Sequence, residues 1–285
     1  MNTRPLRFGA VLCTRGSVAD LVGQARRAAE SGCDVVLLPD HLGYNAPLTS
    51  LVAVATAVPS VRVGTCVLNT AFYQPVLLAR ELAAVDSATG GRLEIGLGAG
   101  YVAEEFATAG LRFPTPAERV QLVDEHVQQI RATFADPDYS PTPVQDAPPI
   151  MIGGAGDKML AMAAEQADIV SILAFGAESE LMQRVQYVKE HAGGRLDRIE
   201  LSFSFGQVSI DDPGDLQLLK QVAPKATESQ IRSMATLLGG PAEAAAERIA
   251  RLQRDLGISY FTFSIGEGRG VTWPTLEKLL ARVKG

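Results

Sequence analysis

The chain has 285 residues, of which 47% are hydrophobic, and a formal net charge of -6 at pH 7. No stretch rich in Pro, Gly and Ser divides the sequence, so we expect a single domain over residues 1–285, a size that α/β barrels reach as one unit. The acidic balance, without a cluster of Lys and Arg, argues against nucleic acid or a membrane surface as a partner.

Strands and helices are predicted in alternation along the chain. Apolar runs predict strands at 6–12, 35–38, 61–68, 92–98, 149–152, 168–173, 199–210 and 258–265. Helices are predicted at 17–31, 50–57, 75–87, 115–134, 157–166, 178–191, 241–256 and from 274, with residues 211–240 as a mostly helical excursion. This order predicts a (β/α)8 barrel with its site at the carboxyl ends of the strands. A doubly wound open sheet is the alternative, but residues 12–16 lack the phosphate-binding glycines expected after its first strand.

The three cysteines, Cys13, Cys33 and Cys66, have no metal-binding spacing, and the N-terminus lacks a charged segment followed by an apolar one. These features predict free thiols and a cytoplasmic protein. Only one of the three histidines, His41, follows a predicted strand, so we expect no metal site. The lysines fall on predicted helices or loops, which argues against a Schiff-base enzyme.

Glycine-rich backbone ends two of the predicted strands. Gly98-Ala99-Gly100 ends the strand at 92–98, and glycines at this point let the backbone approach a ligand closely. Gly153-Gly154 stands at a junction between strand and helix that can present N–H groups to a phosphate, although an ordinary glycine turn is an equally good interpretation. With few titratable side chains nearby, the pattern suits a large planar cofactor that performs the chemistry.

Several motifs occur together, in order and with matching spacing. They are Asp40-His41, residues 64–68 with Pro75, Ala84-Val-Asp86 leading into residues 90–101, Arg119 with Glu125, and residues 148–154. In this combination the chain resembles the luciferase-like monooxygenase superfamily, and it is most similar to the branch that uses the deazaflavin coenzyme F420.

The resemblance implies a cofactor ring held at the carboxyl face of a (β/α)8 barrel. The cofactor-binding residues that the resemblance implies are Asp40, Cys66, Val67, Ala99, Gly100, Gly153 and Gly154. Asp40 would hydrogen-bond to the ring, and Gly153 and Gly154 would lie near the ribityl phosphate. The Cys66–Val67 peptide bond is expected to be cis. His41 is the expected proton donor or acceptor, and the alternative is that it orients a loop.

One position departs from the family pattern. Sugar-phosphate dehydrogenases of this branch have a carboxylate directly after the glycine that matches Gly100, whereas this chain has Tyr101. That substrate class is therefore disfavoured. Glu104 would share a helical face with Tyr101 and either replace the missing carboxylate or cap a solvated helix. We therefore take His41, Tyr101 and Glu104 as the candidate catalytic residues.

The resulting hypothesis is an oxidoreductase that transfers a hydride between F420 and a small organic substrate. One alternative is an FMN-dependent monooxygenase of the same fold, and another is a flavin-binding barrel without turnover. Arg15, Lys158 and Arg269 are candidates for binding the anionic tail of the cofactor. A homodimer is expected because it is common in the family.

Overall fold

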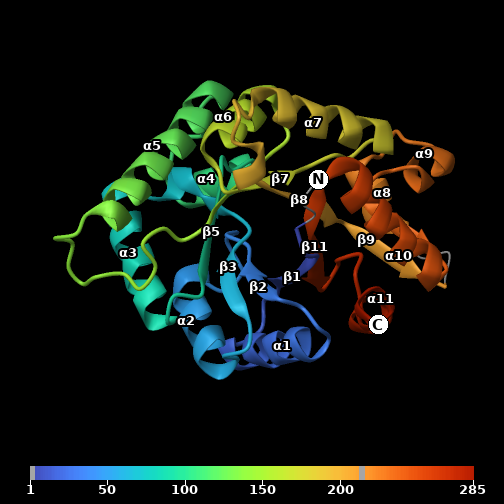
Figure 1. Cartoon of the computed structure of the whole chain (residues 1–285), viewed down its shortest axis with the longest axis horizontal. Coiled ribbons are helices and arrows are strands. Elements are labelled where there is room, and N and C mark those ends of the chain that lie inside the picture. Colours follow the sequence, from blue (N-terminus) through green and yellow to red (C-terminus); the bar gives the residue numbers. More distant parts are fainter. Residues whose placement is uncertain (1–3, 212–215) are drawn as a thin grey trace.

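The computed structural model describes residues 4–211 and 216–285, and over these residues the strands close into a parallel barrel (Figure 1). The barrel strands are β1 (Arg7–Cys13), β2 (Val35–Leu38), β3 (Arg62–Thr65), β5 (Leu93–Gly98), β6 (Ile150–Gly154), β7 (Ile169–Ile172), β8 (Glu200–Phe205) and β11 (Ile258–Gly266). Strand β1 lies between β2 and β11, and the pairing of β3 with β5 completes the ring. The predicted (β/α)8 barrel is confirmed.

Helices surround the strands on the outside of the barrel (Figure 1). They are α1 (Val18–Glu30), α2 (Pro47–Ala57), α3 (Pro75–Ala88), α5 (Pro116–Ala135), α6 (Asp157–Gln166), α7 (Glu178–His191), α10 (Ala242–Arg251), which continues into a π-helical turn at Leu252–Leu256, and α11 (Trp273–Lys284). Two of the predicted helix starts are capping boxes in which side chain and backbone bond reciprocally. Ser17 and Asp20 open α1, and Thr115 and Glu118 open α5.

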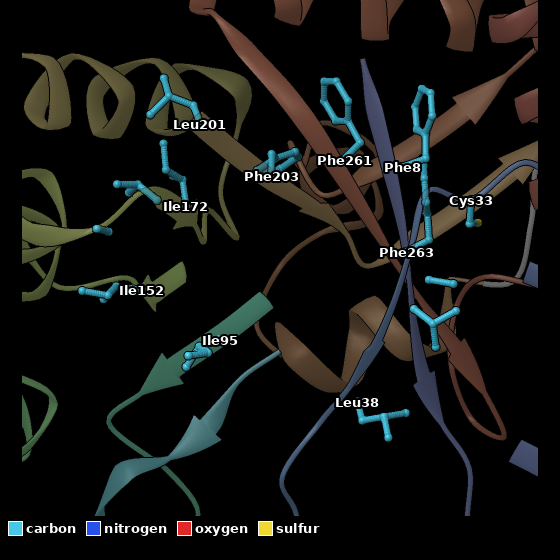
Figure 2. Packing of buried hydrophobic residues seen from close by; sticks show 14 of the residues in the cluster. Phe8, Cys33, Leu38, Ile95, Ile152, Ile172, Leu201, Phe203, Phe261 and Phe263 are labelled. Atoms are coloured by element: carbon cyan, nitrogen blue, oxygen red, sulfur yellow. The ribbon is translucent and has the colours of Figure 1, made fainter. Parts of the chain in front are cut away.

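The larger hydrophobic core fills the space between the strands and the helices. Figure 2 shows part of it, with Ile95, Ile152 and Ile172 contributed by successive strands. A smaller cluster of buried side chains comes from alternate strand positions and includes Val11, Val35, Leu37, Met151, Ile169 and Tyr260. Because successive residues of a strand point to opposite faces, this second cluster occupies the barrel interior.

Glycines inside the barrel let β3 and β5 approach each other closely. The hydroxyl of Thr65 donates to the carbonyl of Gly96 at 2.9 Å and accepts from its N–H at 2.9 Å. A Cβ added at Gly96 would overlap the carbonyl oxygen of Thr65, which is backbone and cannot rotate away. The close contact therefore depends on glycine at position 96.

This contact gives a stability prediction with an internal control. Gly96→Ala is expected to lower the free energy of unfolding by about 1–3 kcal/mol through overpacking. Gly23→Ala, at a position of α1 where a Cβ meets no atom within 4 Å, is expected to raise it by about 0.5–1 kcal/mol. Urea denaturation followed by circular dichroism measures both. Equal effects of the two substitutions would contradict the contact at Gly96.

The bottom of the barrel is closed by charged side chains at the amino ends of the strands. Glu94, only 1% exposed, accepts hydrogen bonds from Arg7 at 2.9 and 3.2 Å and from Arg62 at 2.8 Å. Arg7 also lies 3.3 Å from a carboxylate oxygen of Glu200 and above the ring of Tyr260. Burial raises the pKa of the Glu200 carboxyl, and Arg7 opposes this shift.

The structure corrects the predicted strands at 61–68 and 199–210. The first divides into β3 and β4 (Leu68–Asn69), and the Cys66–Val67 peptide bond between them is cis, as the resemblance implied. The second ends as β8 at Phe205, and β9 (Gln207–Ile210) then pairs with β10 (Leu237–Gly240) in a separate sheet. Gly206 directs this turn, since its N–H donates to the hydroxyl and the carbonyl oxygen of Thr236.

The excursion at 211–240 is only partly helical. It contains α8 (Gln217–Val222), α9 (Glu228–Arg232) and the unpredicted strand β10, and residues 212–215 lie outside the described part of the chain. Helix α2 begins at Pro47 rather than at the predicted Ser50 because a proline at the first helical position has a favourable φ and needs no hydrogen bond.

Candidate functional site

The candidate site residues lie at the carboxyl ends of the strands. Asp40 and His41 follow β2, Cys66 and Val67 follow β3, and Tyr101 follows β5. The described loops at this end also include the short helices η1 (Thr70–Phe72) and α4 (Ala103–Thr108). In barrels of this type, this face carries the active site.

His41 forms a hydrogen-bonded pair with Glu105. Nδ1 of His41 lies 2.9 Å from Oε1 and 3.2 Å from Oε2 of the Glu105 carboxylate. Because a carboxylate only accepts hydrogen bonds, Nδ1 carries a proton in this pair and Nε2 points to the other side. The hydroxyl of Tyr101 lies 3.5 Å from Nε2, and the two rings meet edge to face at 5.6 Å.

The pair is partly shielded but reachable from outside. The side chain of His41 is 25% exposed and that of Glu105 is 15% exposed, whereas Tyr101 is 76% exposed. Nε2 therefore lies beside an exposed aromatic side chain rather than inside the packed core. This arrangement can hold a proton acceptor or donor in a fixed orientation near a bound molecule.

Glu104 does not share a helical face with Tyr101, because α4 begins at Ala103 and Tyr101 precedes it. The side chain of Glu104 is exposed, and the next residue, Glu105, is the one that contacts His41. A catalytic role for Glu104 stays a prediction. Glu105 is a site residue that the sequence reasoning missed.

The orientation of α4 follows from one buried aromatic residue. Phe106 is buried, and its ring lies 5.1 Å from that of Phe72 and 4.9 Å from that of Phe113. Each residue advances an α-helix by about 100°, so with Phe106 facing inward Glu105 lies beside it and Glu104 lies on the far side. This periodicity is the signal that distinguishes the two glutamates.

Asp40 is held in place by two hydrogen bonds to one of its oxygens. Oδ2 accepts from the backbone N–H of Asn69 and from the hydroxyl of Tyr73, both at 3.0 Å. No described residue donates to Oδ1, which leaves that oxygen free to accept a bond from a ligand. Burial raises the pKa of the Asp40 carboxyl, and the bonds from Asn69 and Tyr73 oppose the shift.

Val67 lies against glycines of two neighbouring strands. A Cβ at Gly98 would overlap the side chain of Val67, and a Cβ at Gly153 would lie 3.3 Å from it. Cys66 and Val67 are half-buried, although Thr65 and Leu68 on either side are buried. The two residues thus form an apolar surface within the ring of strand ends, which we call the Cys66–Val67 platform.

The remaining candidate cofactor residues surround this platform with little side-chain bulk. Ala99 and Gly100 are half-buried, and Gly100 has a φ of 66° and no room for a Cβ beside Asn69. Gly154 is needed for packing, because a Cβ there would overlap Met159 of α6. Gly156 directly precedes α6 and supplies no side-chain cap, which leaves N–H groups at the helix start to bind an anion.

These features fit a planar ring carrying a phosphate. An apolar platform, a free carboxylate oxygen and an uncapped helix start match the ring face, the polar ring edge and the phosphate of such a molecule.

Within residues 4–211 and 216–285, no three side chains of His, Cys, Asp and Glu gather in a metal-binding group. In the same residues, no helix is both long and apolar enough to cross a membrane. The assignment of individual cofactor contacts stays a prediction.

Comparison with known proteins places the chain in a family. Residues 5–215 match the model of the luciferase-like monooxygenase family. An F420-dependent glucose-6-phosphate dehydrogenase of Nakamurella multipartita is 31% identical over 238 residues, which are 74% of this chain and 70% of that protein. A protein of the same name from Amycolatopsis mediterranei is 36% identical over 121 residues, but the match spans only 36% of its length and 39% of this chain.

The fold has a close structural counterpart. The F420-dependent tetrahydromethanopterin reductase of Methanopyrus kandleri superposes with a TM-score of 0.81 over 99% of both chains, at 18% sequence identity. That similarity concerns the fold, whereas the family match concerns the sequence over most of the chain. The chain belongs to the luciferase-like monooxygenase family.

Proposed function

We propose that the protein is an F420-dependent oxidoreductase that transfers a hydride between the deazaflavin and a small organic substrate. The observation that carries the proposal is the oriented His41–Glu105 pair at the carboxyl face that also holds the Cys66–Val67 platform. The F420-dependent names of the relatives favour the deazaflavin over FMN. When bound, F420 supplies a ring carbon that accepts or releases a hydride.

The chain's own residues have separate tasks in this proposal. Cys66 and Val67 contact the ring, Oδ1 of Asp40 accepts a hydrogen bond from it, and Ala99 and Gly100 leave it room. Gly153 and Gly154, with the start of α6, face the phosphate. In the oxidising direction, Nε2 of His41 accepts the proton of a substrate hydroxyl as the hydride leaves the same carbon, and in the reducing direction it returns the proton.

The residue after Gly100 disfavours the substrate that is named for the relatives. The carboxylate expected after Gly100 in sugar-phosphate dehydrogenases is absent, and Tyr101 takes its place. We therefore propose oxidation of another alcohol, or reduction of a C=C or C=N bond. Tyr101 covers Nε2 of His41 and is the alternative group for proton transfer.

Cofactor binding tests this proposal directly. Fluorescence quenching of cofactor-free protein is expected to give a dissociation constant for F420 at least tenfold below that for FMN. Val67→Ala removes the two methyl groups of the Val67 side chain from the platform. It is expected to weaken F420 binding by about tenfold, since each buried CH₂ contributes about 0.8 kcal/mol. Val76→Ala, at a position of α3 that is 62% exposed, is the matched control and should leave binding unchanged.

Two results would overturn the proposal. Preference for FMN, together with oxygen consumption by the reduced complex, would identify the monooxygenase alternative. Equal effects of Val67→Ala and Val76→Ala would place the cofactor away from the Cys66–Val67 platform.

A further inference from the structure

Two arginines from loops at opposite ends of the sequence meet at one tyrosine beside the candidate site. Nη2 of Arg269, which follows β11, donates to the hydroxyl of Tyr44 at 2.9 Å. The guanidinium of Arg15, which follows β1, lies 5.6 Å from the centre of the Tyr44 ring. The Tyr44 ring meets that of His41 edge to face at 6.1 Å. Tyr44 therefore adjoins the proposed proton-transfer group, and both arginines contact Tyr44.

In the described part of the chain, the two guanidinium groups contact neutral groups rather than carboxylates. Within the described residues, Arg15 and Arg269 form no ion pair, although Arg269 is half-buried. The groups that interact electrostatically with Arg269 are the Cys13 thiol and the hydroxyls of Tyr44 and Tyr101, all of which are neutral when protonated. By contrast, Arg7 and Arg62 at the barrel bottom share Glu94. A half-buried cation without an anion favours a ligand that supplies one.

The arginines lie across the barrel from the proposed phosphate position. The strand order around the barrel is β1, β2, β3, β5, β6, β7, β8 and β11, which puts β1 and β11 opposite β6 and its neighbour β5. Gly153 and Gly154 end β6, and Lys158 lies in the first turn of α6 that follows. Of the three candidate tail-binding cations, Lys158 is therefore on the phosphate side and the two arginines are on the other.

We infer that Arg269, Arg15 and Tyr44 form a subsite for an anionic group of the substrate, a carboxylate or a phosphate. This inference rests on the proposed function for the identity of the bound molecule as the substrate. Guanidinium groups bind both anions with paired hydrogen bonds, and the Tyr44 hydroxyl already holds Arg269 in position. The protein carries a net charge of -6, and a local pair of cations would attract an anionic ligand against that charge.

The subsite restricts the size of the substrate. The ring centres of Tyr44 and His41 are 6.1 Å apart. An anion held at Tyr44 is therefore close to His41. A small organic acid, or a phosphate ester other than a sugar phosphate, can span this distance and bring its reacting carbon under Nε2. A long uncharged substrate would leave both arginines without a partner. The structure thus favours short anionic substrates.

Calorimetric titration with sodium phosphate and sodium acetate tests the subsite at constant ionic strength, in cofactor-free and in F420-loaded protein. Arg269→Gln is expected to weaken anion binding at least tenfold. Arg15→Gln, at an exposed position, is expected to weaken it several-fold. Arg26→Gln, an exposed arginine of α1, is the matched control and should change neither anion nor F420 binding more than twofold.

The outcomes separate the subsite from the proposed function. Weaker anion binding in Arg269→Gln and Arg15→Gln than in the unmodified protein supports the subsite. The anion that the unmodified protein binds more tightly, phosphate or acetate, identifies the class of anion. Unchanged anion binding in both Arg269→Gln and Arg15→Gln would overturn it. Competition of phosphate with F420, with weaker F420 binding in these variants, would assign the arginines to the cofactor instead. Failure of F420 to bind at all would contradict the proposed function, and the titration of cofactor-free protein would still decide the subsite.

Discussion

His41→Ala is expected to lower kcat by about 10²–10⁴-fold, the usual contribution of a positioned acid or base, while the dissociation constant of F420 stays within about twofold. The physical reason is the geometry of the imidazole, whose Nδ1 is fixed by Glu105 and whose Nε2 faces the open side of the site. Steady-state turnover measures the loss. Added imidazole is expected to restore part of the rate in His41→Ala, because it can enter the vacated space and transfer the proton.

Glu105 and its neighbour Glu104 provide a matched pair of substitutions. Glu105→Gln keeps the shape of the side chain but no longer enforces a proton on Nδ1, so we expect a loss in kcat of about 10–100-fold, as for other partners that orient a histidine. Glu104→Gln changes an exposed side chain of the same helix and is expected to leave kcat within about twofold. A larger loss in Glu104→Gln than in Glu105→Gln would establish the catalytic role first predicted for Glu104.

The same measurements decide between an enzyme and a binding protein. If His41→Ala binds F420 and turns over every tested substrate at the rate of the unmodified protein, His41 only orients a loop. If the unmodified protein binds F420 tightly and shows no turnover with any short anionic or uncharged substrate, the barrel without catalytic activity becomes the better description.

The barrel could be predicted from the sequence because its signals are local. Wholly apolar runs such as Val35–Leu38 identify strands that are buried on both faces, and capping boxes such as that at Thr115 mark helix starts without reference to the rest of the chain. The break after Phe205 could not be predicted in this way. It depends on Gly206 bonding to Thr236, thirty residues later along the chain, and on β10, whose partner β9 is equally distant.

The site was predictable only where its residues stand next to strand ends. Asp40 and His41 follow an obvious strand, so their place at the carboxyl face follows from the fold. The choice between Glu104 and Glu105 depends on which side of α4 faces inward, and that side is marked by Phe106 packing against Phe72 and Phe113 of other segments. The meeting of Arg15 and Arg269 at Tyr44 requires the barrel to close between β1 and β11. Local sequence patterns predict neither the choice between the two glutamates nor the meeting of the two arginines.

The bottom of the barrel gives the largest expected change in stability. Glu94→Ala removes the carboxylate that Arg7 and Arg62 share. Among the described residues, Arg7, above the Tyr260 ring, would keep only Glu200 as an ion-pair partner, and Arg62 would keep only hydrogen bonds to the Leu93 carbonyl and to Gln145. Removing one partner of a buried ion pair lowers the free energy of unfolding by about 3–5 kcal/mol. Both arginines are partly exposed, so we expect a loss near the lower end of that range. Urea unfolding measures the loss as a shift in midpoint at a constant slope.

Glu277→Ala is the control for this prediction. It breaks the ion pair with Arg27, whose two side chains are 40% and 47% exposed, so its expected cost is below about 1 kcal/mol. F420 binding should be the same in both variants, because Glu94 lies at the amino ends of the strands and the Cys66–Val67 platform lies at their carboxyl ends. If Glu94→Ala cost no more than Glu277→Ala, the two arginines would be adequately solvated without their carboxylate. The charged cluster would then close the barrel bottom without stabilising it.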